Sequence, residues 1–333
     1  MSEPLLRVEG LTRHFAVGKL LSRQTLHAVD DVSFELGSGE IVALVGESGS
    51  GKSTIARLLA RVYRPTAGEI YFQGTPISRL RTRRQRLAYA SDVAMVFQDP
   101  YSSLNPAYRV THSLRRGIVL HRREVARRKR EAEVERSLGE VGLLPAGQVA
   151  AKFPHELSGG QRQRVGFAAA LAVRPKLIVA DEPVSMLDVS IRIGVLNLMS
   201  ELREREGVSF LYITHDVASA RYVADRVLVL YAGHLVEEGP AEEVIRRPKH
   251  PYTQLLLAAV PDPRAELGIS DTADIGEPPK VIDPQPGCRF RARCPYAVAE
   301  CATVTPPLRE LGPGRLVACH VAERDEAPAA AAG

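Results

Sequence analysis

Residues 46–54 of this 333-residue chain read Gly-Glu-Ser-Gly-Ser-Gly-Lys-Ser-Thr, which matches the pattern G-x-x-x-x-G-K-[ST] of a phosphate-binding loop. The apolar run 41–45 before the motif predicts a buried strand, and residues 55–60 after it predict a helix. A tight loop between a strand and a helix points several backbone N–H groups at one place, where the helix N-terminus adds positive charge. A chance glycine-rich turn is the alternative, but strand, loop and helix in register favour a nucleoside triphosphate site.

Particular residues of this loop have predicted roles. We expect Lys52 to reach the β- and γ-phosphates and the Ser53 hydroxyl to bind Mg²⁺. The glycines permit positive φ and the close approach of a ligand. The other residues expected to line the nucleotide are Gly46, Ser48, Gly49, Gly51 and Thr54.

Asp181 and Glu182 follow a second apolar run, residues 177–180. An Asp at the carboxyl end of a buried strand beside a phosphate loop can hold Mg²⁺ through water. A neighbouring Glu can orient or deprotonate an attacking water. Asp-Glu alone is a common dipeptide, but in this context it predicts the second half of a nucleotide-hydrolysing site.

The strand-like runs alternate with helical stretches, which predicts an α/β fold with a mostly parallel, helix-covered sheet. Residues 102–174 lack such runs, and 122–141 carry mixed charges at i,i+4 spacing, so we expect a helical insertion there. Residues 1–257 are predicted to form the nucleotide-binding domain and residues 258–322 a Pro-, Arg- and Cys-containing extension. Residues 323–333 are a low-complexity tail predicted to be disordered.

Composition narrows the class of protein. The net charge of +5 is mild, Trp is absent and aromatics make up 5%, which argues against a stacking platform for nucleic acid. Arginines and lysines are concentrated in residues 79–86 and 122–130. Each cluster is interpreted either as a solvated helix face or as a basic patch that binds a membrane or a partner. The first ten residues do not resemble a signal peptide, and no apolar run is long enough to span a bilayer. We therefore expect a cytosolic protein linked to any membrane through partners.

Residues 157–161 read Leu-Ser-Gly-Gly-Gln and precede a second predicted helix start. Two glycines there expose backbone N–H groups, which makes a second anion-binding helix N-terminus in the same chain. A single nucleotide does not need both the phosphate loop and this second helix N-terminus from the same chain. The arrangement predicts a head-to-tail dimer, in which Ser158, Gly160 and Gln161 of one chain complete the partner's site.

Together these motifs resemble the ATPase subunits of ABC transporters over roughly residues 1–255, which implies the P-loop NTPase fold, ATP and Mg²⁺. The resemblance implies that Gln98 senses Mg²⁺ and links to membrane subunits, that His215 contacts the γ-phosphate, and that Phe15 stacks on adenine. Asp188 belongs to the same set, in Ser-Met-Leu-Asp at 185–188. Met186 stands where the family usually has a small residue, which questions how tightly this chain pairs with a copy of itself.

Two segments resemble the oligopeptide and dipeptide importers: residues 98–106, and the stretch from Pro251 through 286–290. The basic insertion before residues 28–30 resembles the second of the two ATPases in those systems. The resemblance implies a partner ATPase in a heterodimer, two transmembrane permeases, an extracytoplasmic solute-binding protein, and a place on the cytoplasmic face of the inner membrane. Alternatives are import of nickel, glutathione or a modified sugar, a soluble ABC ATPase acting on DNA or ribosomes, or a regulator without turnover.

All four cysteines lie in residues 288–319, with the spacing C-x₅-C-x₆-C-x₁₇-C: Cys288, Cys294, Cys301 and Cys319. Such clustering in a cytosolic chain favours a metal site over disulfides. Four thiolates suit a [4Fe–4S] cluster, which some importer ATPases with this extension bind. Zinc is the second candidate, a disulfide pair the third, and ordinary buried cysteines remain an alternative.

Overall fold

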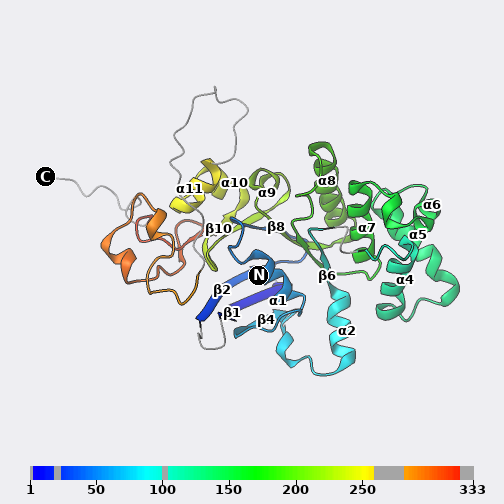
Figure 1. The fold of residues 1–333 in the computed structure, drawn as a ribbon, viewed down its shortest axis with the longest axis horizontal. Helices are drawn as coiled ribbons and strands as arrows, with labels where there is room; N and C mark the ends of the chain where they lie inside the picture. The colour runs from blue at the N-terminus through cyan, green and yellow to red at the C-terminus, as the bar shows by residue number, and fades with distance from the viewer. Residues whose placement is uncertain (1–2, 19–23, 100–103, 259–280, 323–333) are drawn as a thin grey trace.

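The computed structural model describes residues 3–18, 24–99, 104–258 and 281–322. Its larger sheet has the strand order β11-β12-β10-β9-β3-β8-β7-β6, in which β6 to β9 with β3 run parallel and β10 to β12 antiparallel (Figure 1). The bounds are β3 Ile41–Val45, β6 Val93–Val96, β7 Leu177–Asp181, β8 Ser209–Thr214, β9 Arg226–Tyr231, β10 His234–Pro240, β11 Arg309–Glu310 and β12 Leu316–Val317. The expected parallel, helix-covered sheet is confirmed in this central part.

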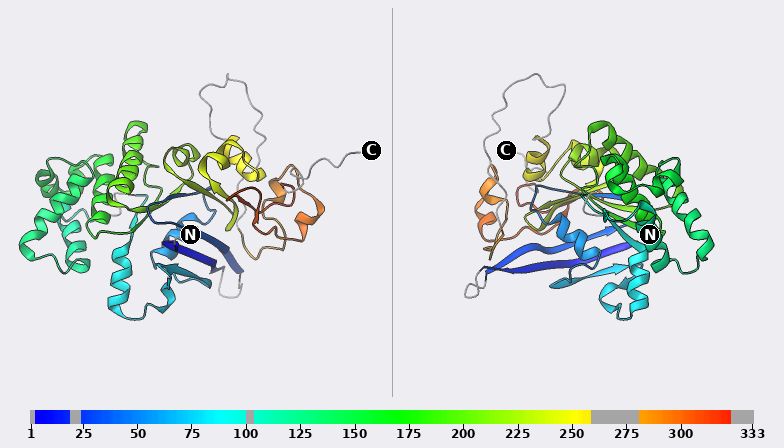
Figure 2. Two further views of the ribbon diagram at one scale, coloured as in Figure 1. Left: turned by 180° about the vertical axis from the view of Figure 1, so that it is seen from behind. Right: turned by 45° about the vertical axis from the view of Figure 1, so that its right-hand side comes forward.

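A second, antiparallel sheet was not anticipated as a separate layer. It has the order β2-β1-β4-β5 and is built from β1 Leu6–Val17, β2 Gln24–Leu36, β4 Ala67–Phe72 and β5 Thr75–Pro76. Phe15 lies near the end of the long strand β1, which pairs with β2 in an antiparallel hairpin. Figure 2 shows this sheet as a layer below the larger one.

Alternating side chains of the central strands supply two separate cores. Ile41, Ala43 and Val45 of β3 pack on one face, while Val42 and Leu44 pack on the other. The second face packs against α1 (Lys52–Leu59), which lies between the two sheets. Burial of both faces explains why these strands read as continuous apolar runs in the sequence.

The expected helical insertion is present between β6 and β7. Its elements are α4 Val110–His121, η2 Arg127–Lys129, α5 Arg130–Glu140, α6 Ala146–Ala151, η3 Pro154–Glu156 and α7 Gly159–Leu171. Residues 122–141 do not form one helix, because the chain turns at 122–126, where Val125 is buried, before α5 begins. The mixed-charge pattern does mark α5, where Arg136 and Glu140 form an i,i+4 pair at 3.0 Å.

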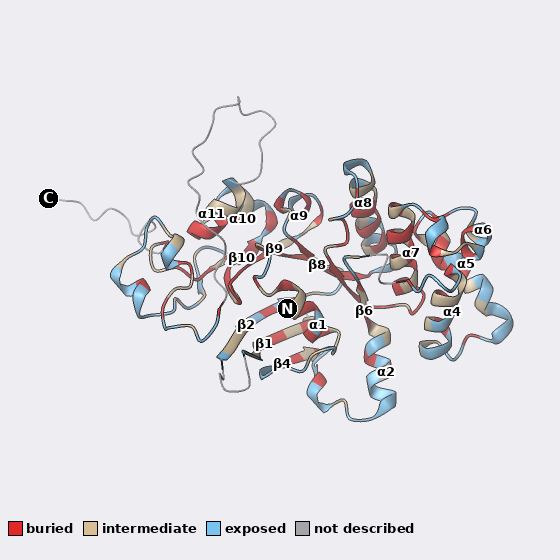
Figure 3. Ribbon diagram, in the orientation of Figure 1, coloured by how far each residue is buried: buried red, intermediate tan, exposed pale blue. Residues whose placement is uncertain are grey.

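The remaining helices surround the larger sheet or join it to the C-terminal region. They are η1 Ile77–Arg79, α2 Arg83–Asp92, α8 Val189–Glu206, α9 Val217–Val223, α10 Ala241–Arg246, α11 Pro251–Ala258, η4 Arg291–Arg293 and η5 Ala299–Ala302. Figure 3 shows the central strands as buried and much of α2 as exposed, and all four arginines at 81–86 on and before α2 are exposed. Within the described residues, no helix combines the length and apolarity needed to cross a bilayer. The tail predicted to be disordered, 323–333, lies outside the described residues, as do positions 100–103 of the segment 98–106.

Candidate functional site

The loop at 46–54 connects β3 to α1 as predicted, and its glycines are required by contact as well as by backbone angle. Gly46 has φ +154° and Gly51 has φ +110°. A Cβ on Gly46 would lie 2.2 Å from the Leu230 carbonyl oxygen, and one on Gly51 would lie 2.2 Å from that of Ala28. The loop is therefore wedged between β9 and β2, and side chains at these positions would push it out of place.

Lys52 is buried at the first turn of α1 and points back into the loop. Its ammonium donates hydrogen bonds to the carbonyl oxygens of Gly46 at 2.7 Å and Glu47 at 2.8 Å. Burial lowers the pKa of Lys52, while the carboxylates of Glu182, Asp181 and Glu47 oppose that change. A buried cation at the N-terminus of a helix is suited to a polyphosphate.

The other loop residues leave room for a ligand. Ser48 and Gly49 are exposed at the rim, and the Thr54 amide bonds back to Gly51. The buried Ser50 hydroxyl has no hydrogen-bond partner among the described residues. A buried polar atom without a partner is costly unless a ligand or water satisfies it. The loop therefore fits a bound phosphate chain.

The predicted Mg²⁺ ligands Ser53 and Asp181 lie together, although they are 128 positions apart. The Ser53 hydroxyl donates to Asp181 Oδ1 at 3.1 Å. Burial raises the pKa of Asp181, and the Ser53 hydrogen bond partly offsets this rise. A hydroxyl and a carboxylate at the foot of a phosphate loop are oxygen ligands of the kind that Mg²⁺ takes.

Glu182 is the centre of the predicted catalytic group. Its carboxylate accepts a hydrogen bond from Gln98 Nε2 at 3.0 Å on one oxygen and lies 3.3 Å from His215 Nδ1 on the other. These three residues follow the carboxyl ends of the neighbouring parallel strands β6, β7 and β8. Glu182 has φ +47°, an uncommon backbone angle for a non-glycine residue. Uncommon backbone angles of this kind cluster at active sites.

The Leu-Ser-Gly-Gly-Gln stretch begins α7, as predicted. Ser158 caps this helix by accepting from the Gln161 N–H at 3.2 Å, and the Gln161 side chain accepts from the Ser158 N–H at 3.1 Å. A Cβ on Gly160 would lie 2.5 Å from Ile191 of α8. In Figure 1, α7 lies in the helical region, away from α1 at the phosphate loop. The structure therefore does not bring Ser158, Gly160 and Gln161 to this chain's own loop.

Apolar side chains are exposed around the turn that joins β7 to α8. Met186 is 61% exposed, Val189 70% and Ile193 47%. Asp188 precedes α8 at its N-cap position and is exposed, with no side-chain capping bond. Exposed apolar groups beside a predicted interface are suited to burial against a partner chain.

Phe15, the predicted adenine platform, lies on β1 with its ring 5.4 Å from that of Tyr63 in an edge-on contact. The Arg13 guanidinium lies 4.4 Å from the Phe15 ring centre. The ring is partly exposed, and it already binds a planar cationic group on its surface. Stacking of adenine on Phe15 stays a prediction.

Sequence reasoning missed the contacts that hold Glu47, the second residue of the loop. Arg293 of the C-terminal extension forms a two-pronged ion pair with the Glu47 carboxylate at 2.8 and 2.9 Å. The Glu47 N–H donates to the Tyr252 hydroxyl at 2.8 Å. Arg293 is 246 positions from Glu47, and no local pattern signals such a pair.

The four cysteines are free thiols in the extension. Burial, then the neighbouring thiols of Cys301, Cys319 and Cys294, raise the pKa of Cys288 to about 11. The Cys288 N–H donates to the Cys301 carbonyl oxygen at 2.9 Å, which brings the backbones of these two cysteines together. Among the described residues, no three of these sulfurs lie within 4.8 Å of one another.

Two protein-family models match the chain. The model described as ABC transporter matches residues 29–185, which contain the phosphate loop and Glu182. The model described as oligopeptide/dipeptide transporter, C-terminal region, matches residues 236–301. The second match begins within β10 and ends at Cys301, so it includes three of the four cysteines.

Curated relatives match almost the whole chain. The putative oligopeptide transport ATP-binding protein YkfD of Bacillus subtilis is 42% identical, over 96% of this chain and 95% of that one. The probable peptide ABC transporter ATP-binding protein y4tS of Sinorhizobium fredii is 43% identical, over 100% and 93%. The oligopeptide transport ATP-binding protein AppF of B. subtilis is 41% identical, over 96% and 98%.

Solved structures show the same fold. The chain is similar to cbiO1 of Clostridium perfringens, part of the ABC transporter complex cbiONQ, with a TM-score of 0.64, 26% identity and coverage of 74% of this chain and 92% of that one. It is also similar to a dimeric ATP-binding cassette in a post-hydrolysis state bound to ADP and phosphate. That match has a TM-score of 0.63, 27% identity and coverage of 71% and 98%.

Proposed function

The chain belongs to the ABC transporter ATP-binding proteins of the oligopeptide and dipeptide type, and from this premise we propose that it energises the import of peptides through separate membrane permeases. As a member of this family it binds ATP with Mg²⁺ and hydrolyses it. The observation that carries the proposal is the Gln98–Glu182–His215 group beside the phosphate loop. Peptide as the solute is supported by the names of the relatives and by the match over residues 236–301.

The residues fit a division of labour in hydrolysis. Lys52 would bind the β- and γ-phosphates, and Ser53, Asp181 and Gln98 would hold Mg²⁺, which supplies charge neutralisation when bound. Glu182 would accept a proton from the attacking water. Gln98 and His215 both contact its carboxylate and would hold it in position for this role. His215 would contact the γ-phosphate, and its exposed side chain is free to turn toward a nucleotide.

A second ATPase chain would complete each site. Ser158, Gly160 and Gln161 lie at a helix N-terminus away from this chain's own loop, and the exposed Met186, Val189 and Ile193 offer an apolar contact surface. The similarity to dimeric cassettes supports a dimer. We propose that the partner is a related but different ATPase, because Met186 is bulky at this surface.

The permeases would bind beside Gln98. A cavity of about 380 Å³ there is lined by Met95, Phe97, Leu104, Gly166 and Ala169, together with residues of α2, α4 and α7. Phe97 is 47% exposed, an apolar side chain next to the residue that contacts Glu182. A permease segment bound in this cavity would report to the catalytic group through Gln98. In this proposed arrangement the chain would lie at the cytoplasmic face of the inner membrane, with a solute-binding protein on the opposite side.

Reconstitution in proteoliposomes tests the function. The chain is combined with a candidate partner ATPase, two permeases and a solute-binding protein, and uptake of labelled tripeptide, nickel, glutathione and a modified sugar is compared. We expect ATP-dependent uptake of the peptide, lost with Glu182→Gln. Uptake of nickel, glutathione or the sugar alone would assign another solute, and ATPase activity indifferent to the permeases would contradict a transport role.

We further propose that Cys288, Cys294, Cys301 and Cys319 hold a [4Fe–4S] cluster. Three of the four sulfurs accept a backbone N–H from the residue two positions later: Phe290 to Cys288, Tyr296 to Cys294 and Val321 to Cys319. Such bonds stabilise thiolates, which are the ligand form.

The cluster would staple an extension that has little core of its own. Its test is metal analysis of protein purified without oxygen. We expect brown protein with about four irons per chain, and the Cys294→Ser variant should lose the iron. Colourless protein with one zinc per chain would assign the site to zinc, and protein without metal would remove the proposal.

A further inference from the structure

The C-terminal extension touches the nucleotide site at its phosphate loop. Glu47 of that loop is held at three groups: its N–H by the Tyr252 hydroxyl, its carbonyl oxygen by Lys52, and its carboxylate by Arg293. The Arg293 side chain is 11% exposed and that of Glu47 26%. The pair is therefore largely shielded from water. Shielded charge pairs interact more strongly than charge pairs at the surface.

Aromatic packing fixes the segment that carries Arg293. Phe290 is 2% exposed and lies 5.2 Å from the Tyr231 ring and 5.6 Å from the Tyr252 ring. Tyr231 ends β9, beside the loop, and its hydroxyl accepts from Arg293 at 3.4 Å. The extension thus inserts one aromatic residue into the sheet's edge and directs an arginine from the next turn onto the loop.

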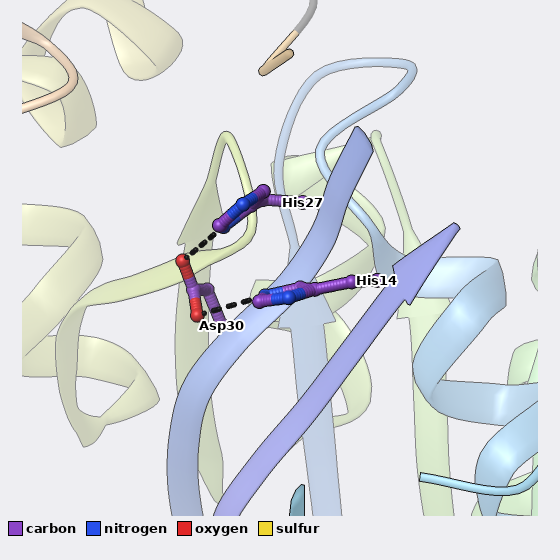
Figure 4. A group of neighbouring side chains, drawn as sticks. All are labelled: His14, His27 and Asp30. Carbon is purple, nitrogen blue, oxygen red and sulfur yellow. Dashed lines mark hydrogen bonds and ion pairs between the residues drawn. The ribbon is translucent and has the colours of Figure 1, made fainter. Parts of the chain in front are cut away.

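A second arginine anchors the same segment to the smaller sheet. Arg289 pairs with Asp30, whose carboxylate also contacts His14 at 3.1 Å and His27 at 2.9 Å (Figure 4) and lies 3.7 Å from His234 Nε2 of β10. The ligand atoms of His14, His27 and Asp30 lie close enough for a metal ion. Arg289 already supplies the positive charge at this carboxylate, so the group is an ion-pair hub joining the extension to the β1–β2 hairpin.

The charge on Glu47 explains why the loop needs Arg293. A carboxylate inside a phosphate-binding loop repels the anionic ligand, and only a neighbouring cation offsets it. Lys52 contacts the Glu47 carbonyl, but its ammonium is needed for the phosphates. We propose that Arg293 is a positioning residue for ATP: it neutralises Glu47 and fixes the phosphate loop, so that the extension sets the affinity of the nucleotide site.

This inference rests on the ATP site proposed above, and equilibrium ATP binding by the purified full-length chain tests both. We expect Arg293→Ala to raise the Kd for ATP by about 5- to 30-fold, which corresponds to 1–2 kcal/mol. The kcat at saturating ATP should stay near that of the unmodified chain. Arg291→Ala is the matched control, because Arg291 is exposed on the same turn and contacts the Ala302 carbonyl instead.

Rescue separates a charge role from a loss of folding. Glu47→Gln combined with Arg293→Ala should return most of the ATP affinity, because the uncompensated carboxylate is gone. Arg293→Lys should recover only part, since an ammonium cannot make the two-pronged contact. A Kd within twofold of the unmodified chain for Arg293→Ala, or no recovery in the double variant, would overturn the inference. Failure of the unmodified chain to bind ATP would instead overturn the site itself.

Discussion

The Gln98 amide donates a 3.0 Å hydrogen bond to the Glu182 carboxylate, although 84 positions separate the two residues. The contact joins the end of β6, after which the helical insertion begins, to the end of β7, where the predicted Mg²⁺ ligand Asp181 lies. A partner that moves the insertion would therefore move a group in contact with the proposed catalytic carboxylate. We propose that binding of a permease and hydrolysis of ATP are linked at this hydrogen bond.

Glu182→Gln should keep ATP affinity while turnover falls by about 10²–10⁴-fold, because the amide does not accept a proton from water. Steady-state phosphate release and equilibrium ATP binding measure the two quantities separately. Glu201→Gln, on the exposed face of α8, is the control and should leave both unchanged. Near-normal turnover of the Glu182 variant would remove this carboxylate from the mechanism.

The sequence predicted what is encoded in contiguous stretches. Local sequence signals for strands, turns and helices determine the geometry of three features. These are the phosphate loop, the end of the strand at Asp181-Glu182 and the capped start of α7. Gln98 and His215 carry no such signal and were assigned by resemblance. The Arg293–Glu47 pair was missed because it depends on how the extension packs against β9. The turn at 122–126 was missed because the mixed-charge pattern continues through it.

Gly51→Ala should disrupt the phosphate loop, because the new methyl would lie 2.2 Å from the Ala28 carbonyl oxygen at φ +110°. Strain of about 1–3 kcal/mol is expected, which is enough to weaken ATP binding roughly tenfold. Gly39→Ala is the control: φ is +70°, but nothing lies within 4 Å of the added carbon. It should cost some stability and no ATP affinity. Equal ATP affinities in the two variants would show that space around Gly51 is unimportant.

Met186 should limit self-association. With turnover blocked by Glu182→Gln and ATP present, we expect the chain to remain monomeric by light scattering. Adding Met186→Ala should favour a homodimer, because a small side chain at this 61% exposed position allows closer approach. Tyr108→Ala, a 47% exposed apolar position in the helical region, is the control. A stable homodimer with Met186 in place would contradict the heteromeric assembly.

His250 should make the fold sensitive to acid. It is 1% exposed, and burial lowers its pKa from 6.5 to about 3. Its Nδ1 accepts the Tyr252 N–H at 3.0 Å, so a proton there would face another donor, and the nearby Glu237 carboxylate is bound to the His250 N–H and to Arg315. The unfolded chain binds this proton more readily than the folded one. The stability contributed by neutral His250 is therefore complete above pH 6.5 and is lost as the pH falls toward 3.

The decrease in the free energy of unfolding caused by His250 approaches about 1.4 kcal/mol per pH unit below pH 6.5. Urea unfolding between pH 7.5 and 5 measures it. His250→Asn keeps an acceptor in place of Nδ1 but does not titrate. The pH slope of its unfolding free energy should therefore be smaller by the His250 contribution, whatever the stability of the variant at pH 7.5. Identical slopes for His250→Asn and the unmodified chain would show that His250 is not the group responsible.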